Sequence, residues 1–353
     1  MTDPSSAIVA GTETRIVGAP AGRLAGATVV VKDVIDVGGF VTGAGNPTWA
    51  ATHEPAAANA RCVQLLLDAG AVVVGKGTCA EFAYSLSGDN AHYGMPLNPA
   101  APDRNPGGST SGPAAAVAAG LCDVGLGTDT LGSIRVPASY CGLYGFRPTF
   151  GAVSFDGVRP LAPSFDTVGV LAASATMLAT VAGVLLDLPP STASVNGVVA
   201  LDDVVVDTAA ALDAFLTIQG YEVWRVYGDW VTAQQPDFGP GVAERFARAA
   251  TVTRDEALAA QRVRADVEQR LLRVLEDGAV LELPPVGPAP RRDADADALQ
   301  AARVSAGRSC CLASIAGLPA VSVPGGAVGG APVGRQFVAG PGEDRALLRF
   351  VAS

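Results

Sequence analysis

PGGSTSGPAAAVAAGLCDVGLGTDTLGSIRVP, residues 106–137, is the most distinctive stretch of this sequence. It holds two turns rich in glycine and serine, at 106–112 and 127–137, with a helix signal at 113–120 between them. Small residues let the backbone approach a ligand closely, and successive N–H groups in such a turn can bind an anion. Either turn alone is equally typical of the start of a helix. The two together predict a pair of binding loops.

A lysine upstream adds a chemical group to these loops. The chain has 24 lysines and arginines, of which Lys32 and Lys76 are the lysines. Lys32 directly follows three valines in VVVKD, a pattern typical of a buried strand. A buried amine can lose its proton and act as a base, whereas a guanidinium effectively cannot. Lys32 is therefore a candidate general base.

Helix and strand signals alternate along the rest of the chain. Residues 57–75 read as a helix followed by a strand, and 255–277 and 295–315 read as helices. Strands are predicted at 222–226 and 320–324, the second directly after the last of those helices. Because strands alternate with helices rather than forming hairpins, we predict an α/β fold with a central mixed β-sheet covered by helices.

Length and composition narrow the class of protein. No linker or charge block divides the 353 residues, so we predict a single domain over 1–353. A net charge of −10 without a basic cluster argues against a nucleic-acid partner. No apolar run approaches the roughly 18–20 residues that span a bilayer, and MTDPSSAIVAGTETR lacks the segments of a secretory signal. We expect a cytoplasmic protein that does not bind membranes.

Several familiar catalytic and metal-binding patterns are missing. The histidines, His53 and His92, lie outside any nucleophile elbow, and Thr110 occupies the place of the serine in GSTSG. The six cysteines form no CxxC pair, and PGGSTSG has no lysine nearby to complete the phosphate-binding G-x-x-x-x-G-K-[ST] pattern. The sequence therefore predicts neither a metal nor a cofactor.

The motifs GGSTSG, GTD, GSIRVP and CGLYG, in this order, resemble the amidase signature family. Ser109 and Ser133 are 24 residues apart, as the two active serines of that family are, and VVVKDVIDV is similar to its lysine strand. Segments 81–94, 164–169 and 315–337 also follow the family's order. The resemblance covers most of the chain. It implies a signature core at about 27–170, a variable region at about 190–300 and a part at 301–353 that completes the fold.

The resemblance also implies roles for individual residues. Lys32 corresponds to the catalytic base, Ser109 to the relay serine at a cis peptide bond, and Ser133 to the nucleophile. A serine hydroxyl is a weak nucleophile and needs such a base. The implied oxyanion hole consists of the backbone N–H groups of Thr130, Leu131, Gly132 and Ser133.

Four further residues are expected to support the site or to line its pocket. Asp129 and Arg135 flank the implied nucleophile, and we favour an ion pair that braces the loop over direct contact with substrate. Tyr84 and Ser85 follow EFA in a helix signal near 79–86 and are expected to line the substrate pocket.

Two residues depart from the family pattern. Leu131 stands where glycine is expected, so its side chain is expected to narrow the acyl pocket or to disfavour a positive φ. Thr110, a supporting residue, follows Ser109 where serine or glycine is usual. The chain is also short for the family, and residues 190–300 are expected to have lost insertions.

The predicted activity is hydrolysis of small carboxylic amides to acid and ammonia through a seryl acyl-enzyme. GNPTW at 45–49 and RVPASYCGLYGFRP at 135–148 are similar to the indole-3-acetamide hydrolase type, which cleaves aryl-acetamides. Two alternatives stay open: a partner-dependent protein like the A-subunit of glutamyl-tRNA amidotransferase, and a catalytically impaired binding protein on the same scaffold. A homodimer also stays open.

Overall fold

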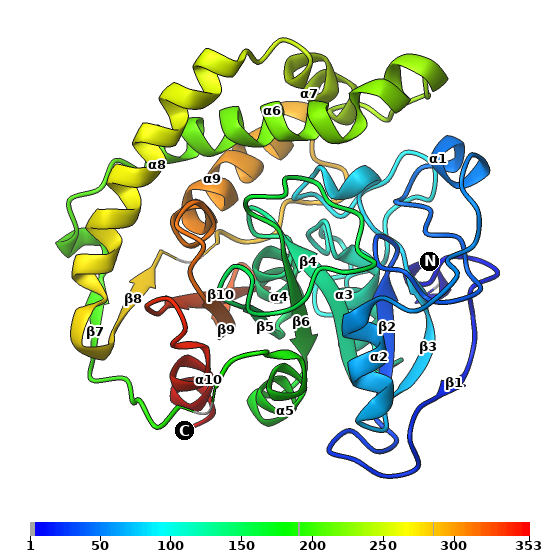
Figure 1. Cartoon of the computed structure of the whole chain (residues 1–353), viewed down its shortest axis with the longest axis horizontal. Helices are drawn as coiled ribbons and strands as arrows, with labels where there is room; N and C mark the ends of the chain where they lie inside the picture. The colour runs from blue at the N-terminus through cyan, green and yellow to red at the C-terminus, as the bar shows by residue number, and fades with distance from the viewer. Residues whose placement is uncertain (1–3, 190, 285) are drawn as a thin grey trace.

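A ten-stranded sheet is the centre of the computed structural model, which describes residues 4–189, 191–284 and 286–353 (Figure 1). The strands are β1 (Ile16–Val17), β2 (Thr28–Lys32), β3 (Val72–Gly77), β4 (Val124–Asp129), β5 (Tyr144–Arg147), β6 (Thr167–Ala172), β7 (Gly197–Ala200), β8 (Ala279–Leu283), β9 (Ala320–Val328) and β10 (Ala331–Val338). They pair in the order β1-β3-β2-β4-β6-β5-β9-β10-β8-β7. β2 runs parallel to β3 and β4, whereas β4 and β6 are antiparallel. The predicted mixed sheet is confirmed.

Ten α-helices surround the sheet within the described residues. They are α1 (Pro47–Ala51), α2 (Arg61–Asp68), α3 (Ser111–Ala118), α4 (Arg135–Cys141), α5 (Ala175–Leu185), α6 (Thr208–Gln234), α7 (Val242–Ala249), α8 (Arg254–Val274), α9 (Ala296–Ile315) and α10 (Asp344–Ala352). α5 contacts both α2 and α10, whereas α3 contacts α4 and packs on β2 and β4. α6 contacts α7, α8 and α9, and with α8 it forms the helical layer across the top and left of Figure 1.

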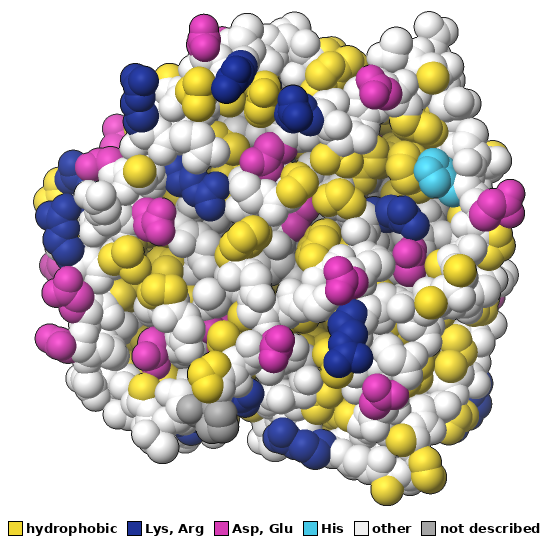
Figure 2. Space-filling model, in the orientation of Figure 1, with side chains coloured by type: hydrophobic (Ala, Val, Ile, Leu, Met, Phe, Trp, Pro, Cys, Tyr) yellow, Lys and Arg dark blue, Asp and Glu magenta, His cyan; other side chains and the backbone are white. Residues whose placement is uncertain are grey.

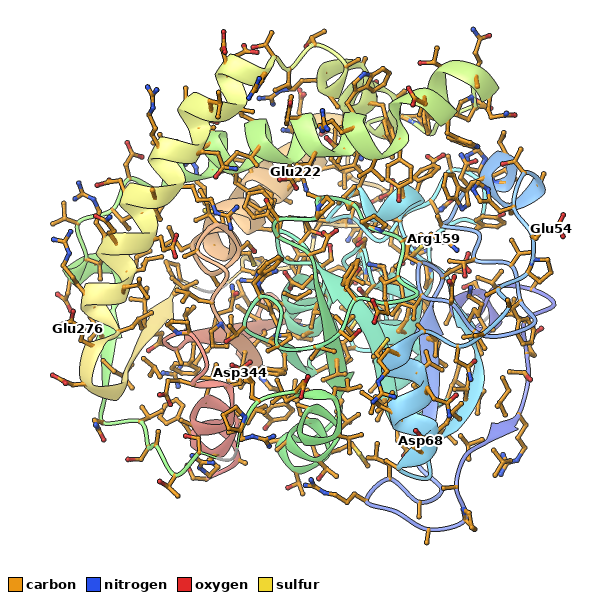
Figure 3. The ribbon with its side chains drawn as sticks, in the orientation of Figure 1. Glu54, Asp68, Arg159, Glu222, Glu276 and Asp344 are labelled. Atoms are coloured by element: carbon orange, nitrogen blue, oxygen red, sulfur yellow. The ribbon has the colours of Figure 1, made fainter. Side chains whose placement is uncertain are left out.

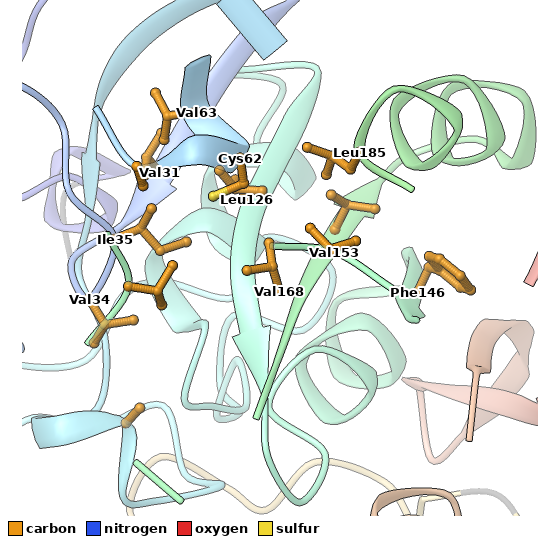
Figure 4. Close-up of a cluster of buried hydrophobic side chains, with 14 of the residues drawn as sticks. Val31, Val34, Ile35, Cys62, Val63, Leu126, Phe146, Val153, Val168 and Leu185 are labelled. Atoms are coloured by element: carbon orange, nitrogen blue, oxygen red, sulfur yellow. The ribbon is translucent and has the colours of Figure 1, made fainter. Parts of the chain in front are cut away.

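Strand alternation divides the core between the two faces of the sheet. Successive side chains of a strand point to opposite faces. Val29 and Val31 of β2 accordingly belong to the apolar cluster that includes Val63 of α2 and Leu185 of α5, part of which Figure 4 shows. Val30 belongs instead to the cluster around the alanines of α3. Lys32 is two residues beyond Val30 and shares its face of the strand.

The outer helical layer is attached to the loop before β6. The carboxylate of Glu222, which Figure 3 labels on α6, accepts a hydrogen bond from the Ser164 N–H at 3.0 Å. One residue further along the loop, the ring of Phe165 lies 4.4 Å from that of Phe215 of α6, centroid to centroid. Both phenylalanines are fully buried. α6 is thereby held against a segment that leads directly into the sheet.

The predicted helices at 255–277 and 295–315 are confirmed as α8 and α9. Thr253 caps α8 by accepting from the Glu256 N–H, while the Glu256 carboxylate accepts from the Thr253 N–H, a reciprocal capping box. Asp295 caps α9 by accepting from the Ala298 N–H. Local capping chemistry explains why these two helices could be recognised in the sequence.

Two predicted elements are wrong. Residues 222–226 are part of α6 rather than a strand, because α7, α8 and α9 pack along that helix and bury its apolar side through Val223. The helix expected near 79–86 is a single 3₁₀ turn, Glu81–Ala83. Phe82 and Ala83 have φ angles of 52° and 57°, and this left-handed backbone cannot continue a right-handed helix.

Replacing Phe215 by alanine tests the attachment of the helical layer. Phe215→Ala removes a fully buried ring and should lower the free energy of unfolding by about 3–5 kcal/mol. Leu258→Ala removes a side chain of α8 that is 50% exposed, and should change it by less than about 0.5 kcal/mol. Urea unfolding followed by circular dichroism measures both. Equal losses in the two variants would contradict the packing described.

Candidate active site

Lys32 lies at the carboxyl end of β2, on the face of the sheet that α3 covers. β4 runs parallel beside it, so the carboxyl ends of the two strands meet at one edge of the sheet. The Lys32 ammonium donates to Ser109 Oγ and to Thr128 Oγ1, each at 2.8 Å. Its side chain is completely buried. The structure therefore brings the predicted lysine and the first predicted serine into direct contact.

The electrostatic setting of Lys32 differs from that of Lys76. Lys76 is also buried, but its ammonium forms an ion pair with Asp33 at 3.0 Å. Within the described residues Lys32 has no such ion pair. Burial lowers the pKa of Lys32 to about 8, although electrostatic interactions with Cys79, Asp166 and Asp129 act in the opposite direction. A substantial fraction of Lys32 can therefore be neutral near physiological pH.

Ser109 is positioned by the turn that precedes α3. The Gly108–Ser109 peptide bond is cis, as the family resemblance implies. A Cβ atom at Gly108 would lie 2.1 Å from the carbonyl oxygen of Ser87, so only glycine fits there. The Ser109 carbonyl accepts from the Ala80 N–H at 3.1 Å, which fixes the far side of the turn. Close backbone packing thus explains the glycine that precedes the serine.

Ser133 lies on the loop between β4 and α4, next to the Ser109 turn. The Thr110 N–H donates to the Ser133 carbonyl at 3.3 Å, and Thr110 Oγ1 donates to the Thr128 carbonyl at the same distance. Thr110 therefore joins the two serine loops. Among the hydrogen bonds of the described residues, none joins the hydroxyls of Ser109 and Ser133.

The backbone amides of residues 130–133 are available to a ligand. Thr130, Leu131, Gly132 and Ser133 donate no backbone hydrogen bond to any acceptor in the described parts of the chain. Buried amides are nearly always paired with protein or water, so four consecutive free donors are unusual. This segment can stabilise negative charge beside the Ser133 hydroxyl.

A buried ion cluster holds this loop in place. Asp129 accepts from Arg135 Nε at 3.1 Å and from Arg135 Nη2 at 2.9 Å, and it pairs with Arg147 at 3.2 Å. Its second oxygen also accepts from the Ile134 N–H at 3.1 Å, which ties down the end of the loop. Burial alone would raise the pKa of Asp129, but the two guanidinium groups outweigh it and hold the pKa at about 2.

Arg135 extends the cluster to α9. Its Nη atoms donate to the Cys310 carbonyl at 2.9 Å and to Ser314 Oγ at 2.8 Å. α9 also approaches the loop so closely that a Cβ at Gly132 would lie 2.8 Å from Cys310 Sγ. Asp129 and Arg135 thus brace the loop between the sheet and α9.

Leu131 is accommodated without backbone strain. Five non-glycine residues of the described chain have a positive φ, and Leu131 is not one of them. The expectation that its side chain would oppose a positive φ is therefore wrong, because the turn needs none at this position. Its side chain lines a small cavity that also borders Ser133, Tyr84 and Ser85. The two residues predicted to line the pocket therefore lie beside the predicted nucleophile.

Asp166 is a buried site residue without a role assigned from the sequence. It begins the segment that enters β6, and since β6 is antiparallel to β4 this places it beside Thr130. Its carboxylate accepts from Thr130 Oγ1 at 2.6 Å and from the Leu161 N–H at 2.7 Å. Burial raises the pKa of Asp166 to about 7, although these hydrogen bonds act to lower it.

Thr128 and Arg147 are further site residues that sequence reasoning missed. Arg147 and Asp166 both lie in motifs that carry the family resemblance, RVPASYCGLYGFRP and SFDTVG, and that position was the signal that could have found them. Thr128 lies in GTD, one residue before Asp129.

Each of the two histidines contacts a side chain other than the predicted catalytic residues. His92 pairs with Glu81 at 3.1 Å, and the ring of His53 stacks 3.7 Å from that of Trp49.

Across residues 4–189, 191–284 and 286–353, no group of three or more His, Cys, Asp or Glu side chains could hold a metal ion. In the same part of the chain, no helix has the length and apolar character needed to cross a membrane.

Asp129→Asn tests the bracing cluster. The variant leaves two buried guanidinium groups without their counter-charge, and should lower the free energy of unfolding by about 3–5 kcal/mol. Asp266→Asn, which breaks the exposed pair with Arg270, should leave the unfolding midpoint unchanged. Denaturant titration of both variants decides the matter. A stable Asp129→Asn protein would show that the loop does not depend on this carboxylate.

Comparison with known proteins identifies the family. The family model "Amidase" matches residues 6–196. Amidase 1 of Oryza sativa subsp. japonica is 36% identical, covering 93% of this chain and 89% of the relative. The A-subunit of glutamyl-tRNA(Gln) amidotransferase from Salinibacter ruber is 44% identical over 46% of this chain and 31% of its own length. A solved structure described as "Crystal structure of amidase" superposes with a TM-score of 0.84 at 28% identity, covering 94% of this chain and 84% of that one. This chain therefore belongs to the amidase family and is an amide-hydrolysing enzyme.

Proposed function

We propose that this chain hydrolyses small primary carboxylic amides to the acid and ammonia through an acyl-enzyme on Ser133. One observation carries the proposal: a buried lysine that has no carboxylate partner among the described residues donates to a serine hydroxyl at 2.8 Å. That serine lies on the loop adjoining Ser133 and its free backbone amides. A base, a relay hydroxyl, a nucleophile and a set of anion donors are the groups that acyl transfer requires.

Acylation uses these groups in sequence. Neutral Lys32 accepts a proton from Ser109 as Ser109 takes the proton of Ser133, whose Oγ forms a bond to the amide carbon. The amide oxygen becomes negative and is stabilised by the backbone N–H groups of residues 130–133. The proton then returns through Ser109 to the nitrogen, the C–N bond breaks, and ammonia leaves. Catalytic hydrogen bonds are often long before substrate binds, so the relay contact between the serines forms in the complex.

Deacylation reverses the relay. A water molecule gives a proton through Ser109 to Lys32 and forms a bond to the acyl carbon. The bond to Ser133 Oγ then breaks, Ser133 regains a proton, and the carboxylic acid leaves. Each half-reaction returns Lys32 to its neutral state, so no outside base or cofactor is consumed.

The cavity supports a small acyl group. It is a narrow space beside Ser133 that suits a substrate of a few heavy atoms, and it shares Tyr84, Leu131, Gln219 and Arg303 with a second, larger cavity. Aryl-acetamides such as indole-3-acetamide are within this class, and Tyr84 and Ser85 would contact their acyl part. The protein would act on a free small molecule, in the cytoplasm, without metal or cofactor.

A partner-dependent amidotransferase component is the second candidate. The local identity to A-subunits favours it, but the similarity to the Salinibacter ruber subunit covers 46% of this chain, whereas that to rice Amidase 1 covers 93%. Such a component would release little ammonia on its own. A catalytically impaired binding protein would bind an amide without acylation. Ammonia release by the isolated chain separates the proposed hydrolase from both.

Substitution of the proposed nucleophile or base should abolish ammonia release. Ser133→Ala and Lys32→Ala should each lower kcat by at least about 10³-fold, because the nucleophile or its base is lost. Ser111→Ala is the matched control: its hydroxyl is buried near Ser109, has no hydrogen-bond partner in the described chain, and should change kcat less than about twofold. Ammonia is measured enzymatically with a panel of primary amides. Full activity of either Ser133→Ala or Lys32→Ala would contradict the mechanism.

The pH dependence follows from the lowered pKa of Lys32. The neutral amine is the active form, so kcat/KM should rise about tenfold per pH unit below about 8 and level off above it. The pKa of Asp166 is about 7, so the profile is also measured in Asp166→Asn, where the limb near pH 8 should persist. A profile that is flat from about pH 6 to 9 would exclude Lys32 as the base.

A further inference from the structure

The cavity over Ser133 leads toward a cluster of arginines. It shares Tyr84, Leu131, Gln219 and Arg303 with the larger cavity beside it. The larger cavity is also lined by Arg245 and Arg248 of α7. The consecutive helices α6 and α7, together with α9, thus bring polar and positively charged side chains to the far end of the acyl pocket.

Arg245 and Arg303 have no ion-pair partner among the described residues. In the described parts of the chain, neither forms an ion pair or a hydrogen bond through its guanidinium, and Arg245 Nε is buried without a partner. The Arg245 guanidinium lies 5.6 Å from the centre of the Tyr84 ring, which holds it over the pocket. Burial and the nearby Arg303 lower the pKa of Arg245 to about 9. Asp89 and Glu244 act in the opposite direction, yet neither pairs with it.

Gln219 adds a neutral donor between the two cavities. Its side chain is 4% exposed, lines both cavities, and makes no hydrogen bond that the described residues account for. A buried amide without a partner is costly. The side chain is therefore positioned for a polar ligand group.

The contact between Arg245 and the Tyr84 ring does not by itself explain why Arg245 and Arg303 lie side by side at this cavity. The chain carries 34 acidic residues, and the buried arginines beside Ser133, Arg135 and Arg147, are paired with one of them. A partly buried pair of arginines without counter-charge carries a desolvation penalty that a bound anion would offset. A neutral aryl group would leave that penalty in place.

We propose that Arg245 and Arg303, with Gln219, form an anion subsite, so that the preferred substrate is an amide whose acyl group ends in a carboxylate. Guanidinium groups match the planar, two-oxygen geometry of a carboxylate. Arg303 and Ser133 line the same small cavity, so only a short chain separates the carboxylate from the reacting amide. The substrate class is therefore the monoamide of a short dicarboxylic acid. This inference rests on the proposed function.

Kinetics with matched amides test the subsite. Succinamate and glutaramate are compared with butanamide and pentanamide, which have the same chain lengths without the carboxylate, and with indole-3-acetamide. The wild-type kcat/KM should be at least about tenfold higher for the better acidic amide than for its neutral counterpart. Arg303→Met and Arg245→Met should each lower kcat/KM for the acidic amide about 10–100-fold, and should change kcat/KM for the neutral amides less than about threefold. Arg308→Met, an exposed position of α9 that borders neither cavity, should change none of them.

Binding to an inactive variant separates this inference from the proposed function. Ser133→Ala should bind glutaramate at least about tenfold more tightly than pentanamide by calorimetry, and adding Arg303→Met should remove the difference. If neutral amides are hydrolysed as well as acidic ones, the subsite is wrong and the hydrolase proposal stands. If no amide is hydrolysed but glutaramate binding depends on Arg303, the subsite stands and the hydrolase proposal falls. If glutaramate neither binds nor reacts preferentially, the subsite is wrong.

Discussion

The Lys32 ammonium is buried with no carboxylate partner among the residues that the structure describes, and the chemistry of this enzyme depends on that burial. The alternation of β2 sends Val29 and Val31 to one face and Lys32 to the other, where α3 closes over it. Two hydroxyl groups, on Ser109 and Thr128, are all that its ammonium contacts through hydrogen bonds in the described chain. Desolvation then outweighs the more distant negative charges, and the amine can exchange a proton near neutral pH.

Several other buried charged side chains, unlike Lys32, form ion pairs. Lys76 is paired with Asp33, and Asp129 is shared by Arg135 and Arg147. These pairs position backbone: the Asp129 cluster fixes the loop whose amides stay free, and it reaches α9 through Arg135. Within the described residues, the cations without an ion-pair partner that concern the proposed chemistry lie close to the proposed substrate path, at Lys32, Arg245 and Arg303. Paired charge supports the scaffold, and unpaired charge marks the chemistry.

Local signals predicted part of this structure. The caps of α8 and α9 lie within a few residues of each helix start, and the resemblance of the two serine loops pointed to contacts 77 residues apart, between Lys32 and Ser109. The strand prediction at 222–226 is wrong because a short β-branched pattern suits a strand, and only contacts with α7, α8 and α9 show that α6 continues. Gln219, Arg245 and Arg303 meet through tertiary packing of three helices, so no spacing in the sequence could have brought them together.

Direct titration of Lys32 is the most informative measurement. The chain contains two lysines, so ¹³C-lysine labelling gives two side-chain signals, and Lys32→Met assigns them by removing one. The account predicts that the Lys32 Cε resonance moves through a single transition near pH 8, with the protein folded throughout. A Lys32 signal that stays in its protonated position up to about pH 10, the range of an ordinary lysine, would contradict the central claim, because the amine would then be charged whenever the enzyme works.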